Sequence, residues 1–544
     1  MNERECDVAV VGAGPTGLTL CNLLGLAGLR VVLIERNATT VQEPRAVSID
    51  DESLRTMQSA GLIEEVLKDV ALDYGSHYFT ADGTCFAKVE PKTREFGYPR
   101  RSAFTQPKLE AVLREGLSRF ASVTTLFGHS CESVRENADG VVVATRPAEG
   151  PDVIVRASYL VGADGARSTI RRVIGAEMVG STYQQRWLIV DLASTKEQFR
   201  QTRVVCNPER PMITLPGPHG IRRYEFMLRK DESDEIATAP EFVRELLAAQ
   251  GPDADAPVVR RQVYTFHARI ANRWQSNRVF LAGDAAHLSP PFAGQGMNSG
   301  IRDAHNLGWK LAAAVQGRLG PGVLATYERE RSPHAWALIK LAVNMGRVMM
   351  PTSRWQAGAV QSAFQAARFV PPVQAYFAQM KYKPKPFYRE GFLVEGDALG
   401  LVGRMIPQPL VEVRWHLCVR LDDLIGNAFG LVAVGANAQR ILDNARALEL
   451  NLANLRPVAV LPSRFNPDPK GPSDILAGRD VDDVLAGAVA NGRDMLLLVR
   501  PDRYVAAAAH VEDLTEISAF AATVNELVDG TWAGTLRPAL VSLT

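Results

Sequence analysis

A glycine-rich turn near the N-terminus constrains the fold of this chain more than any other feature. It matches the pattern GxGxxG and consists of Gly12, Ala13, Gly14, Pro15, Thr16 and Gly17. An apolar, β-branched run at residues 8–11 precedes the turn, an apolar helical stretch at 18–27 follows it, and residues 30–34 form a second predicted strand. Strand, helix and strand within about 30 residues make one βαβ unit, so the sequence predicts an α/β fold.

The turn has the chemistry of a dinucleotide site. Its first glycine permits a tight turn, its second lets the backbone approach a pyrophosphate, and its third allows the helix to pack closely on the strand. The N-terminus of the following helix presents free N–H groups and a positive dipole end to phosphates. Glu35 ends the second strand, where an acidic side chain can accept hydrogen bonds from an adenosine ribose. These features alone leave NAD and FAD open.

Composition excludes several classes of protein. The chain has 544 residues, of which 46% are hydrophobic and 22% charged, and its net charge is +1. This is globular composition, and the near-neutral balance argues against a nucleic-acid partner. No apolar run reaches the length of about 18 residues that spans a bilayer, so we expect no membrane partner. The six cysteines form no CxxC pair and residues 1–7 lack an apolar signal core, so we expect a reducing cytoplasm.

The charge is distributed unevenly along the chain. Residues 391–544 contain 13 basic and 19 acidic side chains, a net charge of −6, and the remainder carries +7. Residues 381–386 read Lys-Tyr-Lys-Pro-Lys-Pro, where the prolines hold the backbone extended. We therefore predict a domain boundary here and a separate C-terminal α/β domain. Its predicted strands are 415–421, 429–434, 458–461 and 495–499, and its predicted helices are 438–448, 481–490 and 517–527.

Two further segments place Gly and Asp where a predicted strand ends. Residues 161–168 read VGADGARS, and residues 281–298 read LAGDAAHLSPPFAGQGMN. The second segment precedes a long helical region, residues 301–349, which we expect to be interrupted near 317–322. Further strands are predicted at residues 141–145, 153–161 and 278–282.

With these three motifs in this order, the chain resembles the flavoprotein aromatic hydroxylases. These are single-component FAD monooxygenases related to p-hydroxybenzoate hydroxylase and phenol hydroxylase. Within that group the chain is most similar to the 3-(3-hydroxyphenyl)propionate (3-hydroxycinnamate) hydroxylases, in residues 264–269, 300–307 and 500–505. The resemblance covers nearly the whole chain.

The resemblance implies a layout for the α/β fold. A Rossmann-like FAD-binding domain, about residues 1–75, 100–180 and 265–350, would be interleaved with a β-sheet substrate domain. The substrate domain would comprise about residues 76–99 and 181–264, followed by a helical segment at about 350–380. Residues 391–544 would form a thioredoxin-like α/β domain without CxxC, with a structural role or a role in a possible homodimer.

The resemblance also implies which residues would hold FAD. The glycine turn and Arg45 would bind the pyrophosphate, and Glu35, beside Arg36, would bind the ribose. Gln106 would contact the flavin or its ribityl chain. The alternative for Arg45 and Gln106 is an ordinary surface ion pair or loop hydrogen bond.

The two Gly/Asp segments would complete the cofactor site. Asp284, after Gly283, would hydrogen-bond the ribityl or phosphate region of FAD. Asp164 and Gly165 would support both FAD and the nicotinamide cofactor. The residues expected to line the isoalloxazine ring are Pro291, Gly294, Gln295, Gly296, Met297 and Asn298.

The implied reaction uses NADH or NADPH and O₂ as co-substrates. NAD(P)H would reduce FAD, and the reduced flavin would take up O₂ to give a C4a-hydroperoxide that hydroxylates a phenolic ring. The expected substrate is 3-(3-hydroxyphenyl)propionate or a similar phenolic acid in aromatic catabolism. One alternative is a polyketide-tailoring or simple-phenol hydroxylase, and another is a non-hydroxylating flavin-binding sensor or oxidase. No metal site is expected.

Candidate catalytic residues are few. A phenol with a pKa near 10 is mostly protonated at neutral pH, so a hydrogen-bond acceptor should assist the reaction. The sequence does not identify this acceptor; the candidates are His267 and His287, with Pro291 beside the ring. A packed or capping histidine is the alternative for both.

A carboxylated substrate favours an arginine partner. Arg186, Arg222 and Arg223, with Tyr224, lie between the two Gly/Asp segments, in the predicted substrate sheet. Because neighbouring strand residues face opposite sides, at most one of Arg222 and Arg223 points inward. Surface arginine is the alternative for each.

Overall fold

The computed structural model of the protein describes residues 2–40, 45–395, 399–413, 416–446, 448–468, 474–490 and 492–530. Its N-terminal part is the predicted βαβ unit, formed by strand β1 (Asn2–Val11), helix α1 (Pro15–Leu26) and strand β2 (Val31–Glu35). β1 and β2 pair in parallel, with Val8 opposite Val31. Apolar residues 31–34 are all buried, as expected of a strand covered on both faces.

The βαβ unit belongs to a seven-stranded sheet in the order β8-β2-β1-β11-β10-β9, with β17 beside β11. The parallel neighbours of β1 are β2 and β11, so the glycine turn lies at the carboxyl edge of the sheet. The added strands are β8 (Val123–Phe127), β9 (His129–Glu136), β10 (Val141–Pro147), β11 (Val153–Gly162) and β17 (Val279–Leu281).

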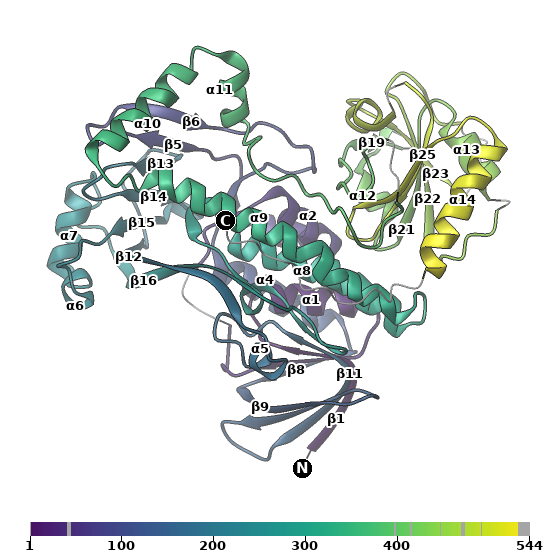
Figure 1. Ribbon diagram of the computed structural model, residues 1–544, viewed down its shortest axis with the longest axis horizontal. Coiled ribbons are helices and arrows are strands. Elements are labelled where there is room, and N and C mark those ends of the chain that lie inside the picture. Colours follow the sequence, from purple (N-terminus) through teal and green to yellow (C-terminus); the bar gives the residue numbers. More distant parts are fainter. Residues whose placement is uncertain are drawn as a thin grey trace.

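A second sheet has eight strands in the order β18-β16-β12-β15-β14-β13-β5-β6. Its longest pair is antiparallel, β12 (Met178–Leu192) with β16 (Val258–Ala271). Its segments alternate along the chain with those of the first sheet, and Figure 1 shows the two sheets on either side of the central helices. The other strands are β5 (Ser76–Phe79), β6 (Cys85–Val89), β13 (Thr202–Val205), β14 (Met212–Pro216), β15 (Arg222–Met227) and β18 (His287–Leu288).

The predicted helical region is confirmed as α8 (Gly296–Val315) and α9 (Thr326–Met349), separated by a 3₁₀ turn at Pro321–Ala325. α8 packs on α1, and both long helices cross the centre of the molecule in Figure 1. A small sheet, β3 (Ser48–Ile49), β7 (Ser102–Phe104) and β4 (Val70–Ala71), lies beside them. The remaining helices before residue 380 are α2 (Asp51–Ser59), α3 (Ile63–Leu67), α4 (Gln106–Gly116), α5 (Thr169–Val173), α6 (Asp234–Ala237), α7 (Pro240–Ala248), α10 (Arg354–Ala367) and α11 (Pro371–Ala378).

The C-terminal part contains a third sheet, ordered β20-β19-β23-β22-β21-β24-β25. Its centre is parallel, and β24 and β25 continue it antiparallel. The strands are β19 (Leu410–Glu412), β20 (Cys418–Arg420), β21 (Phe429–Val434), β22 (Leu455–Leu461), β23 (Leu476–Asp480), β24 (Met495–Val499) and β25 (Val505–His510). The helices are α12 (Leu421–Ile425), α13 (Ala438–Ala445) and α14 (Leu514–Asp529).

Two C-terminal predictions need correction. The helix predicted at residues 481–490 forms only in its second half, because the Asp480 carboxylate accepts the N–H groups of Leu485 and Ala486 and starts the helix there. The strand predicted at 415–421 is shorter: β20 ends at Arg420, and Leu421 already begins α12. Trp415 lies outside the described residues.

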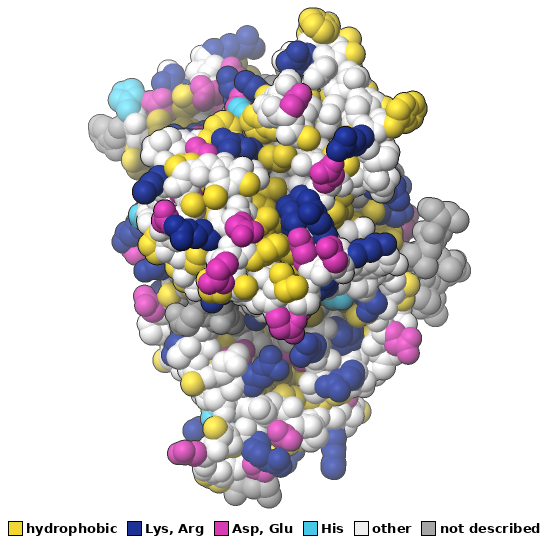
Figure 2. Space-filling view, turned by 90° about the vertical axis from the view of Figure 1, so that its left-hand side faces the viewer, with side chains coloured by type: hydrophobic (Ala, Val, Ile, Leu, Met, Phe, Trp, Pro, Cys, Tyr) yellow, Lys and Arg dark blue, Asp and Glu magenta, His cyan; other side chains and the backbone are white. Residues whose placement is uncertain are grey.

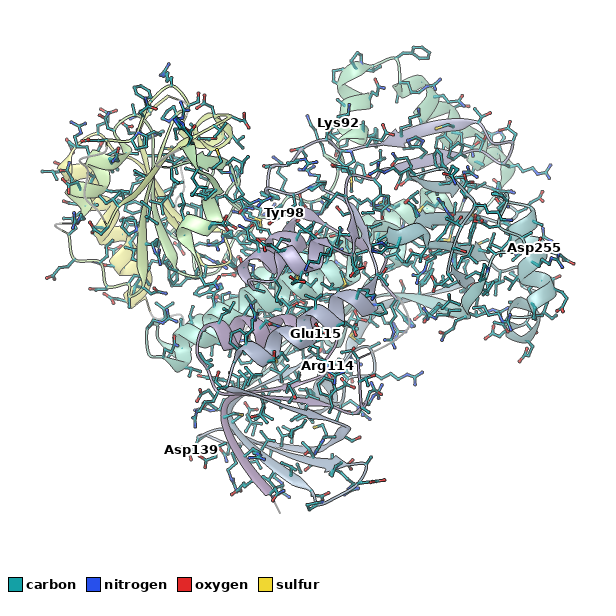
Figure 3. All side chains as sticks on the ribbon, turned by 180° about the vertical axis from the view of Figure 1, so that it is seen from behind. Lys92, Tyr98, Arg114, Glu115, Asp139 and Asp255 are labelled. Carbon is teal, nitrogen blue, oxygen red and sulfur yellow. The ribbon has the colours of Figure 1, made fainter. Side chains whose placement is uncertain are left out.

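Buried ion pairs join the C-terminal sheet to the rest of the protein. Arg55 on α2 donates to both carboxylate oxygens of Asp422, each at 2.7 Å. Arg500, at the end of β24, lies 2.8 Å from Glu330 on α9. Closer to the surface, the guanidinium of Arg420 lies 4.7 Å from the ring centroid of Tyr98, which Figure 3 shows at this junction.

The surface carries both signs of charge. Over the face shown in Figure 2, basic and acidic side chains are intermingled, in agreement with the net charge of +1. Within the described ranges, no helix is both long and apolar enough to cross a membrane.

Candidate active site

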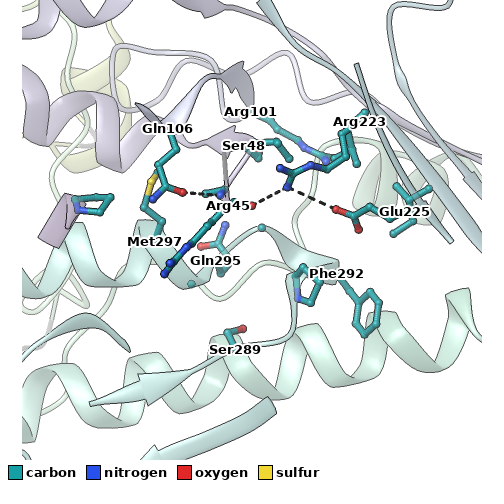
Figure 4. Close-up of a pocket in the computed structure, with 18 of the residues that line it drawn as sticks. Arg45, Ser48, Arg101, Gln106, Arg223, Glu225, Ser289, Phe292, Gln295 and Met297 are labelled. Carbon is teal, nitrogen blue, oxygen red and sulfur yellow. Dashed lines mark hydrogen bonds and ion pairs between the residues drawn. The ribbon is translucent and has the colours of Figure 1, made fainter. Parts of the chain in front are cut away.

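A cavity of about 330 Å³ lies where the glycine turn, the start of α8 and the second sheet meet (Figure 4). More than half of the predicted cofactor residues line it. They are Gly14, Pro15, Thr16, Arg45, Gln106, Gly165, Asp284, Pro291, Gly294, Gln295, Gly296 and Met297. Of the predicted substrate residues, Arg223 lines it as well.

The glycine turn forms one end of the cavity. Gly12 has a φ of +110°, and a Cβ there would lie 2.3 Å from the Ala163 carbonyl oxygen. A Cβ on Gly17 would lie 1.9 Å from the Gly12 oxygen, so the turn itself requires both glycines. A Cβ on Gly14 would meet nothing within 4 Å, so this glycine faces open space.

Glu35 holds the same turn from the end of β2. Its Oε2 accepts the Ala13 N–H at 2.8 Å, and its Oε1 accepts the Asn37 N–H at 2.9 Å. Glu35 is not among the residues that line the cavity.

A buried network fixes the second Gly/Asp segment. The Gly283 N–H donates to Asp303 Oδ2 at 3.0 Å, and His287 Nε2 lies 2.7 Å from the same oxygen. Arg331 donates to Asp303 Oδ1 at 2.8 Å. Against the effect of burial, His287 and Arg331 lower the pKa of Asp303 to about 2. Asp284 is left pointing into the cavity, where desolvation by the surrounding protein raises the pKa of its carboxyl.

Helix α8 begins at the cavity. The 3₁₀ turn Pro291–Ala293 ends at Gly294, whose φ of +63° is left-handed. Asn298 fixes this turn from behind, because its Nδ2 donates to the Gly294 oxygen at 2.6 Å and to the Ser48 oxygen at 3.1 Å. The first turn of α8 therefore presents N–H groups and a positive dipole end to the cavity.

Gln106 ties the Arg45 loop to α4. Its Oε1 accepts the Ala46 N–H at 2.7 Å, and its Nε2 donates to Glu110 at 2.7 Å. Arg45 and Gln106 both line the cavity, as Figure 4 shows.

The opposite wall is the inner face of the second sheet. Because side chains alternate along a strand, every second residue of four neighbouring strands faces the cavity. These residues are Ser76 and Tyr78 on β5, Thr202 and Val204 on β13, Ile213 and Leu215 on β14, and Arg223 and Glu225 on β15. Phe292 closes the apolar side and packs edge-on against Trp187 and Phe266.

Strand β15 brings an ion pair and a buried carboxyl to this wall. Arg223 Nε donates to Asp191 at 2.6 Å, and Arg223 Nη1 donates to the Arg45 oxygen at 2.7 Å. Glu225 is 5% exposed, and its Oε1 lies 3.9 Å from Arg223 Nη1 (Figure 4). Burial raises the pKa of Glu225 to about 7, although Arg223 opposes this shift. The carboxyl can therefore exchange a proton near neutral pH.

Comparison with known proteins identifies the family. Residues 5–342 match the model for the FAD binding domain, and residues 403–523 match the model for the HcaD C-terminal domain. A 3-(3-hydroxy-phenyl)propionate/3-hydroxycinnamic acid hydroxylase of Klebsiella pneumoniae (strain 342) is 40% identical over 513 residues, 93% of this chain and 92% of that protein. The enzyme of the same name from Mycobacterium avium (strain 104) is 41% identical, over 95% of this chain and 92% of that protein. The chain belongs to the FAD-dependent aromatic hydroxylases.

Solved structures share this fold. The flavin-dependent monooxygenase PieE, in complex with FAD and substrate, aligns with a TM-score of 0.79 at 21% identity, over 97% of this chain and all of PieE. Aklavinone-11 hydroxylase, in a ternary complex with FAD and aklavinone, aligns with a TM-score of 0.75 at 25% identity, over 97% of this chain and all of that chain. The protein is a single-component flavoprotein hydroxylase that uses FAD, with NAD(P)H and O₂ as co-substrates.

The cavity of the hydroxylase fits FAD. Gly14, Gly165 and Gly296 all face open space there, so backbone N–H groups are accessible to phosphate and ring oxygens. Asp164 lies beside Gly165 but is not among the residues that line the cavity, and its Oδ2 accepts the Thr169 N–H at 2.6 Å. Open glycines and the α8 N-terminus are what the pyrophosphate and ring oxygens of a flavin dinucleotide would satisfy.

Three predicted substrate residues lie outside the cavity lining. Arg186 bonds Asp234 and the Glu232 oxygen. Arg222 donates to Thr214 at 3.1 Å and to the Phe199 oxygen at 2.6 Å, and Tyr224 donates to Asp253 at 2.9 Å. Arg222 and Arg223 face opposite sides of β15, as the alternation predicts, and of the two Arg223 lines the cavity.

The two predicted histidines also lie elsewhere in the hydroxylase. His267 Nδ1 lies 2.9 Å from Thr182 Oγ1 on the long β12–β16 pair, and burial lowers its pKa. His287 is 1% exposed and bonds Asp303, which makes it a support of the Gly/Asp segment. Arg36 is exposed and, like Gly283, is not among the residues that line the cavity.

Sequence reasoning missed two charged residues of the cavity, Glu225 on β15 and Arg101 just before β7. A period of two, applied from Arg223 onward, would have placed Glu225 on the same face. Arg101 had no comparable signal, because it lies in a loop and contacts Ser76 and Thr202, which are 25 and 101 residues away in the sequence.

Proposed function

We propose that this hydroxylase adds one oxygen atom to the ring of 3-(3-hydroxyphenyl)propionate or a similar phenolic acid. The phenol, O₂, NAD(P)H and a proton give a dihydroxylated ring, water and NAD(P)⁺. One observation carries the proposal. The glycine turn, Arg45 and the start of α8 form one wall of the cavity, the cofactor wall, and it faces the apolar side of the second sheet, which holds the buried, titratable carboxyl of Glu225. The relatives that are about 40% identical over most of the chain carry the name of this substrate.

FAD would be held by the predicted residues that line the cavity. The Gly14–Thr16 turn and Arg45 would bind its pyrophosphate, and Asp284 would bind its ribityl region. Residues 294–297 would contact its ring, where the α8 N-terminus favours negative charge. When bound, FAD supplies the chemistry that accepts hydride and delivers oxygen.

The chain's own contribution is to position the phenol and to accept its proton. The ring lies on Ile213, Leu215 and Val204, whose apolar side chains exclude water. Glu225 accepts the phenol proton through a carboxylate oxygen, because a phenol with a pKa near 10 is a poor nucleophile while protonated. Arg223, held by Asp191, steadies the Glu225 carboxylate.

The layout expected from the resemblance is part of this proposal. The alternation of the first two sheets along the chain supports an FAD-binding domain interleaved with a substrate domain. The mixed third sheet with α13 and α14 supports a thioredoxin-like C-terminal domain without CxxC. The cytoplasmic setting and the possible homodimer stay predictions.

A polyketide-tailoring activity is the second candidate. It is favoured by the likeness to OxyS anhydrotetracycline hydroxylase of Streptomyces rimosus, at 26% identity and a TM-score of 0.71 over 93% of this chain and 96% of that one. It stands second because the relatives that are about 40% identical carry the name of a one-ring phenolic acid.

The test is a substrate panel with purified, FAD-loaded protein. We expect 3-(3-hydroxyphenyl)propionate to stimulate oxidation of NADH or NADPH and to gain one oxygen from ¹⁸O₂ by mass spectrometry. Hydroxylation of a polycyclic phenol alone would favour the second candidate. NAD(P)H oxidation that yields only hydrogen peroxide would favour a non-hydroxylating oxidase.

A further inference from the structure

Arg101 is a charged side chain of the cavity that the reaction described above does not use. It lies just before β7 and reaches the edge of the second sheet. One guanidinium nitrogen donates to Ser76 Oγ, and Nη2 lies 3.5 Å from Thr202 Oγ1. Its guanidinium carbon lies 4.7 Å from the centroid of the Tyr74 ring.

The three arginines of the cavity differ in their partners. Arg223 is ion-paired with Asp191, and Arg45 lies on the cofactor wall with Asp284. Over the described part of the chain, Arg101 contacts hydroxyl groups and a ring, and no carboxylate lies within ion-pair distance of it. A guanidinium in a cavity wall without an anion gains more from a carboxylate than an arginine that is already paired.

The sheet register places Arg101 and Glu225 at opposite ends of one apolar floor. Glu225 pairs with Ile213, Ile213 with Val204, and Val204 with Tyr78 across four strands. Ser76 and Thr202, which hold Arg101, form the pair that precedes Tyr78 and Val204 on β5 and β13. β15 and β13 are two strand spacings apart, about 10 Å. A phenol ring with a short carboxylated arm spans such a floor.

We infer that Arg101 is the substrate-specificity residue of the hydroxylase and binds the carboxylate of its phenolic acid substrate. This inference rests on the proposed function. Ser76 and Thr202 hold the guanidinium at the cavity wall, and its remaining N–H groups form a bidentate pair with the carboxylate. The phenol hydroxyl then points to Glu225, and the ring is presented to the cofactor wall in one orientation.

The experiment compares two substrates on three variants. The substrates are 3-(3-hydroxyphenyl)propionate and 3-ethylphenol, which keeps the phenol and lacks the carboxylate. Arg101→Met should lower kcat/KM for the acid about 100-fold, mainly through KM, because the substrate carboxylate loses its charged partner. It should change kcat/KM for 3-ethylphenol less than about 3-fold. Arg101→Lys should recover part of the activity on the acid, since it restores the charge but not the planar fork.

Arg203→Met is the matched control. Arg203 follows Thr202 on β13, faces away from the cavity and pairs with Glu197 at 3.3 Å. The Arg203→Met variant should leave the ratio of kcat/KM for the two substrates unchanged. Equal losses on both substrates in Arg101→Met would overturn the inference.

A second readout separates the inference from the proposed function. The binding of each ligand to the FAD-loaded protein is measured by the change in flavin absorbance, which needs no turnover. A wild-type protein that binds the acid more tightly than 3-ethylphenol, but hydroxylates neither, would contradict the proposed function and support the carboxylate site. The inference alone would be contradicted if the wild type hydroxylated the acid and 3-ethylphenol with equal kcat/KM and Arg101→Met gave the same two values.

Discussion

Glu225 and Arg223 lie two residues apart on β15, and this spacing decides which charges of that strand reach the cavity. Arg222 and Tyr224 carry equally polar groups, but they face the other side and bond Thr214 and Asp253. The alternation of side chains along β15 therefore decides which of residues 222–225, all polar in the sequence, reach the cavity.

The first prediction concerns the pH dependence of Glu225. Burial raises its pKa to about 7, so the carboxyl is protonated and unable to accept a proton below that pH. We expect kcat/KM of the wild type to rise with pH through about 7 and then level off. Glu225→Gln should remove this limb of the profile and lower kcat about 100-fold, within the usual contribution of a general base.

Glu225→Asp is the conservative control. It keeps a carboxyl group, and its profile should retain a limb with kcat between those of the wild type and Glu225→Gln. The charged groups that face Glu225 are Arg223 and Asp191, which are ion-paired with each other. An unchanged limb in Glu225→Gln would assign the proton acceptor elsewhere.

At the scale of an element, the glycine turn contains two glycines that the fold requires and one that the cofactor requires. Gly12 and Gly17 are needed because a Cβ would collide with backbone oxygens of the turn and of the neighbouring strand. Gly14 has room for a Cβ in the protein alone. The need for glycine at position 14 is therefore explained by the proposed approach of the FAD pyrophosphate to the turn.

The second prediction uses this difference. Gly14→Ala should leave the melting temperature of the FAD-free protein almost unchanged and weaken FAD binding about tenfold or more. Gly17→Ala should lower the melting temperature of the FAD-free protein by several degrees, because its Cβ would lie 1.9 Å from the Gly12 oxygen. Thermal melts and titration with FAD measure the two effects. Equal FAD affinity in Gly14→Ala would contradict the placement of the pyrophosphate.

At the scale of the molecule, buried charges join the third sheet to the long helices. Arg500 lies between Glu330 and Asp502, at 2.8 and 2.6 Å, and Lys310 lies 2.7 Å from Glu330. All four side chains are almost fully buried. Burial opposes the shift, but Arg500 and Lys310 lower the pKa of Glu330 to about 2.

The third prediction follows from this network. Arg500→Met leaves Glu330 and Asp502 buried with fewer cations, which should lower the free energy of unfolding by about 3–5 kcal/mol. The surface pair Arg493–Glu512, at 3.1 Å, provides the control, because Arg493→Met should cost less than about 1 kcal/mol. Denaturant midpoints measure both. A similar midpoint for the two variants would show that the network does not hold the C-terminal part.

The sequence by itself determined the local units and the family. Short-range patterns predict the βαβ unit, the glycine turn and the helical region at 301–349, because apolar residues recur every second position in a strand and about every 3.6 positions in a helix. The FAD cofactor followed from three motifs in order. Glu35, Asn298 and His287, also named from the sequence, are not among the residues that line the cavity, and their hydrogen bonds fix the turns beside it.

Only the tertiary structure decided which side chains meet at the cavity. Arg101 contacts Thr202 across a separation of 101 residues, and the face of β15 that carries Glu225 turns inward because of how β14 and β15 pair. Strand register and sheet order are set by contacts between distant segments, and a change of one residue in register exchanges the two faces. For this reason most residues of the cofactor wall could be named from the sequence, whereas Arg223 was the single correct choice among the eight sheet residues that line the cavity.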